Sequence, residues 1–271
     1  FMKKTLIALA VAASAAVSGS AMAWQDGDFN GSVDIGGSIT SEQPTWQWKI
    51  ANMSADAINL KLADATQSGS NNVWSNIGEE AYTILLGKTK FEYSGVSSGM
   101  SPVITYGGDG FNIKQPSDSA PIITLTATGK TDTSKVGTLV FKMNMFALSD
   151  HTWKGNGVDT ADKDTYQMIA DTSKAYGNGY FQNAGYVKTM TSDDVKNELT
   201  RILGADMISI SSSAISTPTY TGPNIFDRAD AFNIEGVYGS EYVANSGTLT
   251  FPQNATPTDW KATLRVTVSY Q

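Results

Sequence analysis

The chain has 271 residues, of which 41% are hydrophobic and 17% are charged, with no cysteine and a formal net charge of −7 at pH 7. An acidic chain is a poor ligand for a phosphate backbone, so a nucleic-acid partner is not expected, and the hydrophobic content suffices for a folded core. An exported protein could use disulfides and this one has none, so its fold must depend on its own core, a partner or copies of itself.

The chain begins with the three parts of a secretory signal peptide. Lys3 and Lys4 precede the apolar run Thr5–Val17, and Ala21-Met22-Ala23 is typical of a cleavage site. Residues 1–23 are therefore predicted to be removed on export. The apolar run is too short for a membrane helix, and no later segment has the roughly 18 consecutive apolar residues that such a helix needs.

Residues 24–40, called the donor segment below, predict one extended strand with a single apolar face. Polar residues alternate along it with Phe29, Gly31, Val33, Ile35, Gly37 and Ile39. Glycines weaken an internal strand but let a backbone lie deep in a groove. The first strand of a sandwich would give a similar pattern, and that reading stays open from the pattern alone.

Residues 41–271 predict an all-β domain, because apolar residues recur with period two far more often than with a helical period. Turn sequences such as Asp109-Gly110 and Asn245-Ser246-Gly247 separate the candidate strands. Short strands at such spacing are typical of a sandwich or barrel. The predicted strands are Trp46–Ile50, Ile58–Ala63, Tyr82–Leu86, Val103–Tyr106, Phe111–Lys114, Ile122–Ala127, Val136–Leu148, Phe232–Tyr238, Thr248–Phe251 and Ala262–Tyr270.

Two stretches break the strand pattern between about 149 and 231, and this region is interpreted as an insertion that carries one or two short helices. The first helix is predicted between a capping Thr191 and a terminating Gly204. Its apolar face consists of Val195, Leu199, Ile202 and Leu203. A weaker helix is predicted over Asp162–Ala175, with Tyr166, Ile169 and Ala170 on its inner face.

The C-terminal segment also alternates, and an aromatic residue stands at its penultimate position. Its apolar residues are Leu264, Val266, Val268 and Tyr270. A terminal core strand would look similar. Taken with the donor segment, however, the pattern indicates an exposed strand at one end of the chain and an open sheet edge at the other, as donor-strand pairing between chains requires.

The sequence GDFNGSVDIGGSIT within Trp24–Thr40 closely resembles the N-terminus of FaeG-type major subunits of enterobacterial chaperone–usher fimbriae. Further similar stretches are WQWK at 46–49, ILLGKTK at 84–90, TSKVG at 133–137 and the C-terminal residues 260–270. The resemblance spans the chain and is densest at its two ends.

This resemblance implies an incomplete immunoglobulin-like sandwich that a donor strand completes. A periplasmic chaperone would pair first with the C-terminal strand, and the donor segment of the next copy would replace it as an outer-membrane usher exports the growing cell-surface fimbria. In this family the major subunit is also the adhesin, through an inserted subdomain that binds host glycoconjugates. The predicted insertion, about 149–231, lies where that subdomain is expected. The alternative is a purely structural pilin, with adhesion carried by another subunit.

The candidate glycan-binding residues come from the insertion, where aromatic faces and fixed polar groups could hold a sugar. The family's contacting stretch resembles Phe-Ala-Asp-Gly-Leu-Arg, which corresponds to residues 169–174 here. Asp171 is retained, Lys174 replaces the arginine, and Ile169 stands where an aromatic residue is expected. The predicted set is Trp153, Tyr166, Ile169, Asp171, Lys174 and Tyr176. The alternative is that the aromatic residues only pack the core of the insertion.

No motif indicates an enzyme, a cofactor or a metal site. Gly95-Val96-Ser97-Ser98-Gly99 matches a hydrolase nucleophile elbow, but an elbow needs a preceding strand, a following helix and a histidine base. The single histidine, His151, is predicted to lie in a loop. The acidic residues at 159, 162 and 164 lack the glycine and closing glutamate of a calcium loop and predict a solvated face. A secreted hydrolase is the third alternative, favoured by the serine motif alone.

Overall fold

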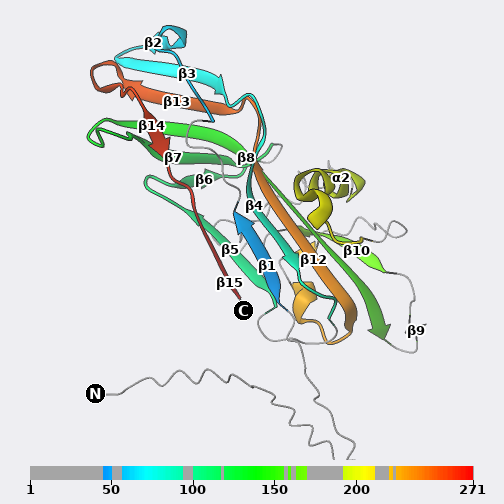
Figure 1. The fold of residues 1–271 in the computed structure, drawn as a ribbon. Coiled ribbons are helices and arrows are strands. Elements are labelled where there is room, and N and C mark those ends of the chain that lie inside the picture. The colour runs from blue at the N-terminus through cyan, green and yellow to red at the C-terminus, as the bar shows by residue number, and fades with distance from the viewer. Residues whose placement is uncertain are drawn as a thin grey trace, which may run out of the picture. The chain divides into compact units, whose positions relative to one another are not determined.

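Strands dominate the computed structural model (Figure 1), which describes residues 45–50, 57–93, 100–116, 119–155, 158–159, 163–169, 192–210, 220–221 and 224–270. These residues belong to one unit, Gln43–Gln271. The predicted signal peptide, 1–23, and the donor segment, 24–40, lie outside the described residues.

The strands are β1 (Trp46–Ile50), β2 (Thr66–Ser68), β3 (Asn71–Ile77), β4 (Tyr82–Thr89), β5 (Pro102–Gly107), β6 (Asn112–Lys114), β7 (Ile122–Gly129), β8 (Val136–Gly155), β9 (Val158–Asp159), β10 (Asp164–Ile169), β11 (Tyr220–Thr221), β12 (Ala231–Tyr242), β13 (Gly247–Pro252), β14 (Trp260–Ala262) and β15 (Arg265–Tyr270). The helical elements are α2 (Ser192–Leu203) and the short 3-10 helices η1 (Leu62–Asp64), η3 (Gly204–Asp206), η4 (Asn224–Asp227) and η5 (Gln253–Ala255). The expected all-β fold is confirmed.

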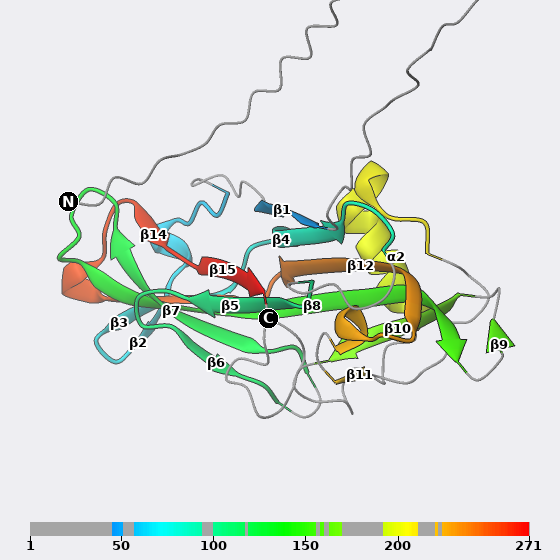
Figure 2. The same cartoon turned by 90° about the horizontal axis from the view of Figure 1, so that it is seen from below.

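The long strand β8 joins the two halves of the larger sheet. Its first half pairs with β7 and β13, and its second half pairs with β12 and β10. The main strand order is β1-β4-β12-β8-β13-β3-β2, and β14 and β6 both pair with β7. Strands β5 and β15 form a separate antiparallel pair, called the small sheet below, in which Tyr270 lies opposite Pro102. In both views β15 runs between β5 and β1 (Figures 1 and 2).

Hydrogen bonds from buried aromatic residues hold the small sheet against the larger one. The Tyr106 hydroxyl of β5 donates to Ser240 Oγ at 2.8 Å and lies 2.9 Å from the Tyr238 hydroxyl, both on β12. The Trp46 indole of β1 donates to the Met100 carbonyl, just before β5, at 2.9 Å. Burial raises the pKa of Tyr106 to about 12, so the network keeps its protons at physiological pH.

Helix α2 packs on the face of the larger sheet that is turned away from the small sheet, as its apolar face predicted. The packed residues are Val195, Leu199 and Leu203 of the helix and Leu86, Phe146, Leu148 and Val237 of the sheet. Arg201 adds an ion pair of 2.6 Å with the buried Glu241 of β12. The helix ends at Gly204, whose φ of 56° is in the left-handed region that favours glycine.

Most predicted strands are confirmed, and two are wrong in part. Residues 57–61 form no strand, and η1 begins at Leu62 where the strand Ile58–Ala63 was expected. The C-terminal strand is divided into β14 and β15 because its two parts pair with different neighbours, β7 and β5. Strands β2, β3, β9 and β11 were not predicted. Polar residues predominate in β3, which therefore lacks a clear apolar alternation.

The predicted helix Asp162–Ala175 is wrong over residues 164–169, which form β10; the rest of it lies outside the described residues. β10 pairs antiparallel with the end of β8, with Asp164 opposite His151. Thr165 Oγ1 donates to Asp150 Oδ1 at 2.8 Å across this pair. Pairing with the edge of β8 thus stabilises residues 164–169 as a strand, and this tertiary contact outweighs their weak local helical pattern.

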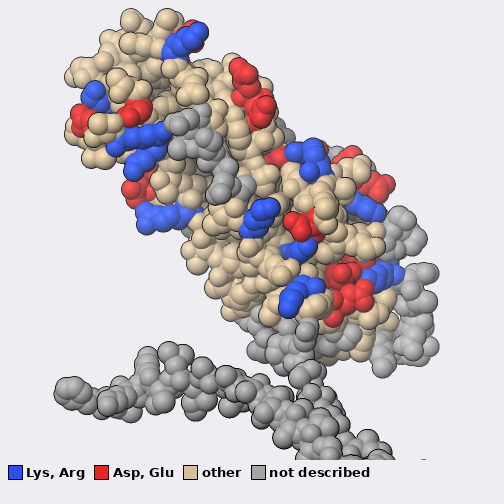
Figure 3. Space-filling model, viewed as in Figure 1, with Lys and Arg blue, Asp and Glu red and all other residues tan. Residues whose placement is uncertain are grey.

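Within the described residues, no helix is both long and apolar enough to cross a membrane. On the face shown in Figure 3, lysine and arginine side chains are interspersed with aspartate and glutamate.

A pair of strand glycines tests the packing beside the small sheet. A Cβ added to Gly87 of β4 would lie 2.2 Å from the Trp48 ring, whereas one added to Gly107 of β5 would meet open space. We predict that Gly87→Ala lowers the free energy of unfolding by about 1–3 kcal/mol, because Trp48 must leave its stack on Trp46. Gly107→Ala should change it by less than about 0.5 kcal/mol. Urea unfolding followed by tryptophan fluorescence measures both, and equal effects would contradict this packing.

Candidate functional site: an apolar groove beside the C-terminal strand

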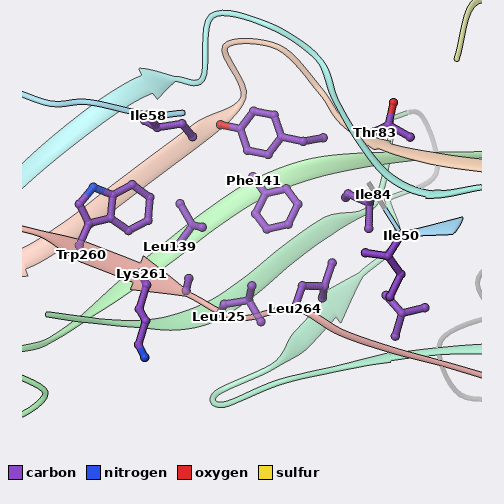
Figure 4. Close-up of a pocket in the computed structure, with 13 residues that line it drawn as sticks. Ile50, Ile58, Thr83, Ile84, Leu125, Leu139, Phe141, Trp260, Lys261 and Leu264 are labelled. Atoms are coloured by element: carbon purple, nitrogen blue, oxygen red, sulfur yellow. The ribbon is translucent and has the colours of Figure 1, made fainter. Parts of the chain in front are cut away.

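An apolar cavity of about 350 Å³, called the groove below, lies between β1 and the C-terminal segment (Figure 4). It is lined by Ile50, Ile58, Thr83, Ile84, Leu125, Leu139, Phe141, Tyr242, Trp260, Lys261, Ala262, Leu264 and Val266. In Figure 4, Leu139 and Leu264 point toward Phe141, whereas the ammonium end of Lys261 points away. The surface that the groove offers is therefore mainly apolar.

Segments far apart in the sequence supply the two sides of the groove. Ile50, at the end of β1, lies on one side, and Leu264 and Val266 lie on the other. Leu264 and Val266 pack against the main core but are only partly buried, and Ile50 is 62% exposed. Large apolar side chains are rarely left uncovered together, so this surface indicates a binding site.

Both bordering strands have one edge without a strand partner in the described part of the chain. β1 pairs with β4 alone, and β15 pairs with β5 alone. An unpaired edge presents a row of backbone N–H and C=O groups that another strand can join. The groove therefore combines an apolar floor with two backbone edges.

The four residues predicted for the C-terminal strand lie along this border. Leu264 and Val266 line the groove, and Val268 packs against the core. The Tyr270 hydroxyl accepts a hydrogen bond of 2.7 Å from the Trp48 indole of β1. Their role in binding a chaperone or a donor strand stays a prediction. The six predicted donor residues lie outside the described residues.

Sequence reasoning missed the residues that complete the groove from the other strands. Ile50, Phe141 and Tyr242 come from β1, β8 and β12. The Tyr242 hydroxyl donates to the Ile77 carbonyl, and burial raises its pKa to about 12, so it acts here as an apolar wall. The one available signal was the alternation of Trp46, Trp48 and Ile50, which put three large apolar residues on one face.

A second cluster surrounds His151, which is fully buried in β8 and not in a loop as the sequence predicted. Its ring contacts Trp153 and Tyr166 edge-on, with centroids 4.7 and 4.8 Å away. Neither ring nitrogen has a hydrogen-bond partner. Burial, assisted by the positive charge of Arg228, lowers the pKa of His151 to about 4, so the ring is neutral at pH 7.

The candidate glycan residues are only partly described. Ile169 is buried and belongs to the main core. The Arg228 guanidinium lies 4.5 Å from the Trp153 ring centroid, and the Trp153 indole donates to Asp164 at 2.7 Å. Asp171, Lys174 and Tyr176 lie outside the described residues. Glycan binding by this set stays a prediction.

Carboxylates near His151 are held by a lysine. Lys163 Nζ binds Glu235 at 3.2 Å and Asp150 at 3.5 Å, and it also contacts Glu92. Burial lowers the pKa of Lys163, but its bonds to Glu92 and Glu235 outweigh this and raise it above the ordinary value. Among the described residues, no group of three histidine or acidic side chains could hold a metal ion.

The sequence model of the family described as "Fimbrial, major and minor subunit" matches residues 2–271. The chain belongs to this family. It is 31% identical to K88 fimbrial protein AC of Escherichia coli over 302 residues, covering 99% of this chain and 100% of that protein. K88 fimbrial protein AB of the same species is 30% identical over 297 residues, covering 99% and 100%. K88 minor fimbrial subunit FaeI is 27% identical over 249 residues, 90% of each chain.

Family membership makes the protein a structural subunit of a cell-surface fimbria, in which subunits associate with copies of themselves. The alternative of a secreted hydrolase is wrong, because the relatives are fimbrial subunits and not enzymes. The serine motif that favoured it lies outside the described residues, and His151 is enclosed by aromatic rings.

His151 should make the subunit less stable in acid. Its pKa in the folded state is below the ordinary 6.5, so its contribution to stability is fully present above about pH 6.5 and is lost as the pH falls toward 4. We predict that His151→Phe, which retains a ring between Trp153 and Tyr166, reduces the loss of unfolding free energy between pH 7 and pH 4 by about 3 kcal/mol. Urea unfolding at the two pH values measures this. If the loss of unfolding free energy between pH 7 and pH 4 is the same in His151→Phe and the wild type, protonation of His151 does not destabilise the folded state.

Proposed function

We propose that this fimbrial subunit polymerises by donor-strand exchange, in which the donor segment of one copy enters the groove of the next. The observation that carries the proposal is the groove: an apolar channel bordered by the unpaired edges of β1 and β15. An extended segment with one apolar face satisfies all three surfaces at once, because its backbone pairs with the edges and its alternate side chains enter the floor.

The donor segment and the C-terminal border have matching lengths. From Phe29 to Ile39 the donor presents six alternate positions, and from Trp260 to Tyr270 the border also presents six. Each covers eleven residues, which in a fully extended donor amounts to about 36 Å. Gly31 and Gly37 would let the donor backbone lie low, where side chains would hold it away from the floor.

Burial of the donor side chains is large enough to hold a fibre together. Phe29, Val33, Ile35 and Ile39 would each contribute about 1.5–3 kcal/mol, or about 6–12 kcal/mol together before backbone hydrogen bonds are counted. The two strand edges add those bonds. A link of this size needs no disulfide, in agreement with the absence of cysteine.

The same groove supports a requirement for a periplasmic chaperone before assembly. A subunit waiting for its neighbour would expose apolar side chains and strand edges, a combination that leads to aggregation. A chaperone strand along Leu264–Tyr270 would cover it until an outer-membrane usher brings the next subunit. In this scheme the protein crosses the periplasm as a chaperone complex and reaches the surface as part of the fibre.

The adhesive role comes from the sequence resemblance alone. Among the described candidates, Ile169 is buried and Trp153 already contacts Arg228 and His151. A glycan array probed with a donor-completed monomer separates the adhesin from the purely structural pilin. Binding that Lys174→Ala abolishes supports the predicted site, and absence of any binding supports the structural alternative.

One donor side chain tests the proposed register. Ile35→Asp would place an unpaired carboxylate in an apolar pocket, at a cost of several kcal/mol beyond the lost burial. Asp34 lies on the other face of the strand, so Asp34→Ala is the matched control. We predict that Ile35→Asp folds and binds chaperone but does not extend fibres, whereas Asp34→Ala assembles normally. Fibre length by electron microscopy measures this, and equal assembly would refute the register.

Covalent completion tests the missing strand. A chain that starts at Thr40 should be insoluble or depend on chaperone, because nothing fills its groove. Moving Asp28–Thr40 to the C-terminus through a short flexible linker should give a soluble monomer that unfolds cooperatively. Size-exclusion chromatography and thermal unfolding measure both properties. A soluble, cooperatively melting 40–271 fragment without any partner would refute the incomplete-sandwich proposal.

A further inference from the structure

One hydrogen bond joins the two strands that border the groove. The Trp48 indole of β1 donates to the Tyr270 hydroxyl of β15 at 2.7 Å, although these residues are 222 positions apart and their strands belong to different sheets. β1 and β15 share no backbone pairing in the described residues. This side-chain contact therefore bridges the space that a donor backbone would enter.

The bridge lies at one end of the groove. The lining residues stop at Ile50 on β1 and at Val266 on β15. The next inward-facing positions along the two strands are Trp48 on β1 and then Val268 and Tyr270 on β15. Four of the six alternate positions of the C-terminal border are thus open to an incoming strand, and the last two lie beside the bridge.

The two partners are held very differently. The Trp48 ring covers Gly87, stacks on Trp46 with centroids 5.2 Å apart and contacts Tyr238 at 6.0 Å. Tyr270 is 42% exposed and is the last residue of β15. Trp48 is the fixed partner, and Tyr270 is the one that can move aside.

We infer that the Trp48–Tyr270 hydrogen bond is a latch that closes one end of the groove in the empty subunit and must open before a donor segment can pair along the whole of β15. This inference rests on the proposed function and concerns how that site is controlled. Trp48 and Tyr270 are positioning residues: the latch restricts a donor to four positions until it opens.

The size of the latch's effect on donor uptake is limited by the strength of one hydrogen bond. A neutral hydrogen bond of this kind changes an equilibrium by about three- to tenfold. If the competent state is the open one, the latch lowers the apparent affinity and rate of uptake by that factor. Removing either the Tyr270 hydroxyl or the Trp48 indole N–H should raise the affinity and the rate of donor uptake by the same factor.

The test follows uptake of a fluorescent peptide of residues 24–40 by the refolded full chain, at low subunit concentration with the peptide in excess. Tyr270→Phe and Trp48→Phe each remove one side of the bond and keep an aromatic ring. Tyr82→Phe is the matched control, because the Tyr82 hydroxyl donates to the Ala57 carbonyl at 3.3 Å and does not join β1 to β15. Fluorescence anisotropy gives the rate and the final occupancy.

We expect Tyr270→Phe and Trp48→Phe each to accelerate uptake about three- to tenfold, the double variant to gain no more than either, and Tyr82→Phe to match the wild type. Equal rates in the wild type and both latch variants would overturn the latch and leave donor-strand exchange standing. No uptake by any variant, or equal uptake of a scrambled peptide, would overturn the proposed function itself.

Shortened peptides locate the effect. One lacks residues through Gly31 and the other ends before Gly37, so each has four of the six alternate positions. One of the two peptides lacks the end that would lie beside Tyr270, and it should bind the wild type and Tyr270→Phe at the same rate. The other peptide retains that end and should bind Tyr270→Phe faster than the wild type. Acceleration of both would contradict a latch confined to one end of the groove.

Discussion

The structure depends on the C-terminal strand β15, which within the described residues has a sheet partner on one side only. β15 pairs with β5, while the side chains of Leu264, just before β15, and of Val266 and Val268 within it remain half-covered. In a closed sandwich the next strand would cover them and take up the free backbone groups. Here apolar side chains remain partly exposed beside a strand edge whose backbone groups have no strand partner in the described residues. In the proposed donor-strand exchange, this surface binds the neighbouring subunit of the fibre.

The groove keeps its form because other contacts fix its borders. Tyr106 ties the small sheet to β12 through Tyr238 and Ser240, and Trp46 ties β1 to the segment before β5. β8 contributes to the groove floor with its first half and carries β12 and β10 with its second. Such buried, fully paired networks are rigid. In the proposed donor-strand exchange, the free energy of binding would then not be spent on ordering the acceptor groove.

Polar and charged side chains lie around the C-terminal end of β8, unlike in the apolar groove. There the interior holds polar groups: a neutral His151 between aromatic rings, and Lys163 shared among Glu92, Asp150 and Glu235. The lysine neutralises carboxylates that burial would otherwise penalise, and burial raises the pKa of Glu235 above its ordinary value. This end of the sheet therefore responds to pH, whereas no histidine or acidic side chain is among the residues that line the groove.

The sequence by itself determined the class of fold, most of the strands and helix α2. Period-two alternation in the strands and the four-residue spacing of Val195, Leu199 and Leu203 in the helix are local properties, and the burial of these residues follows from them directly. It also predicted a donor segment and an alternating C-terminal segment, since the alternation of residues 24–40 and of Leu264–Tyr270 can be recognised without knowing what either segment contacts.

Tertiary structure alone decided which distant segments meet. Ile50 and Val266 line the same groove, Trp48 donates a hydrogen bond to Tyr270, and residues 164–169 form a strand because they pair with the edge of β8. His151 is buried for the same reason, since β10 and its Tyr166 cover a position that local polarity assigned to a loop. The periodicity of a short stretch shows which face of its strand or helix is apolar. The segment that packs on that face is decided by contacts between residues far apart in the sequence, and a short stretch of the chain does not contain that information.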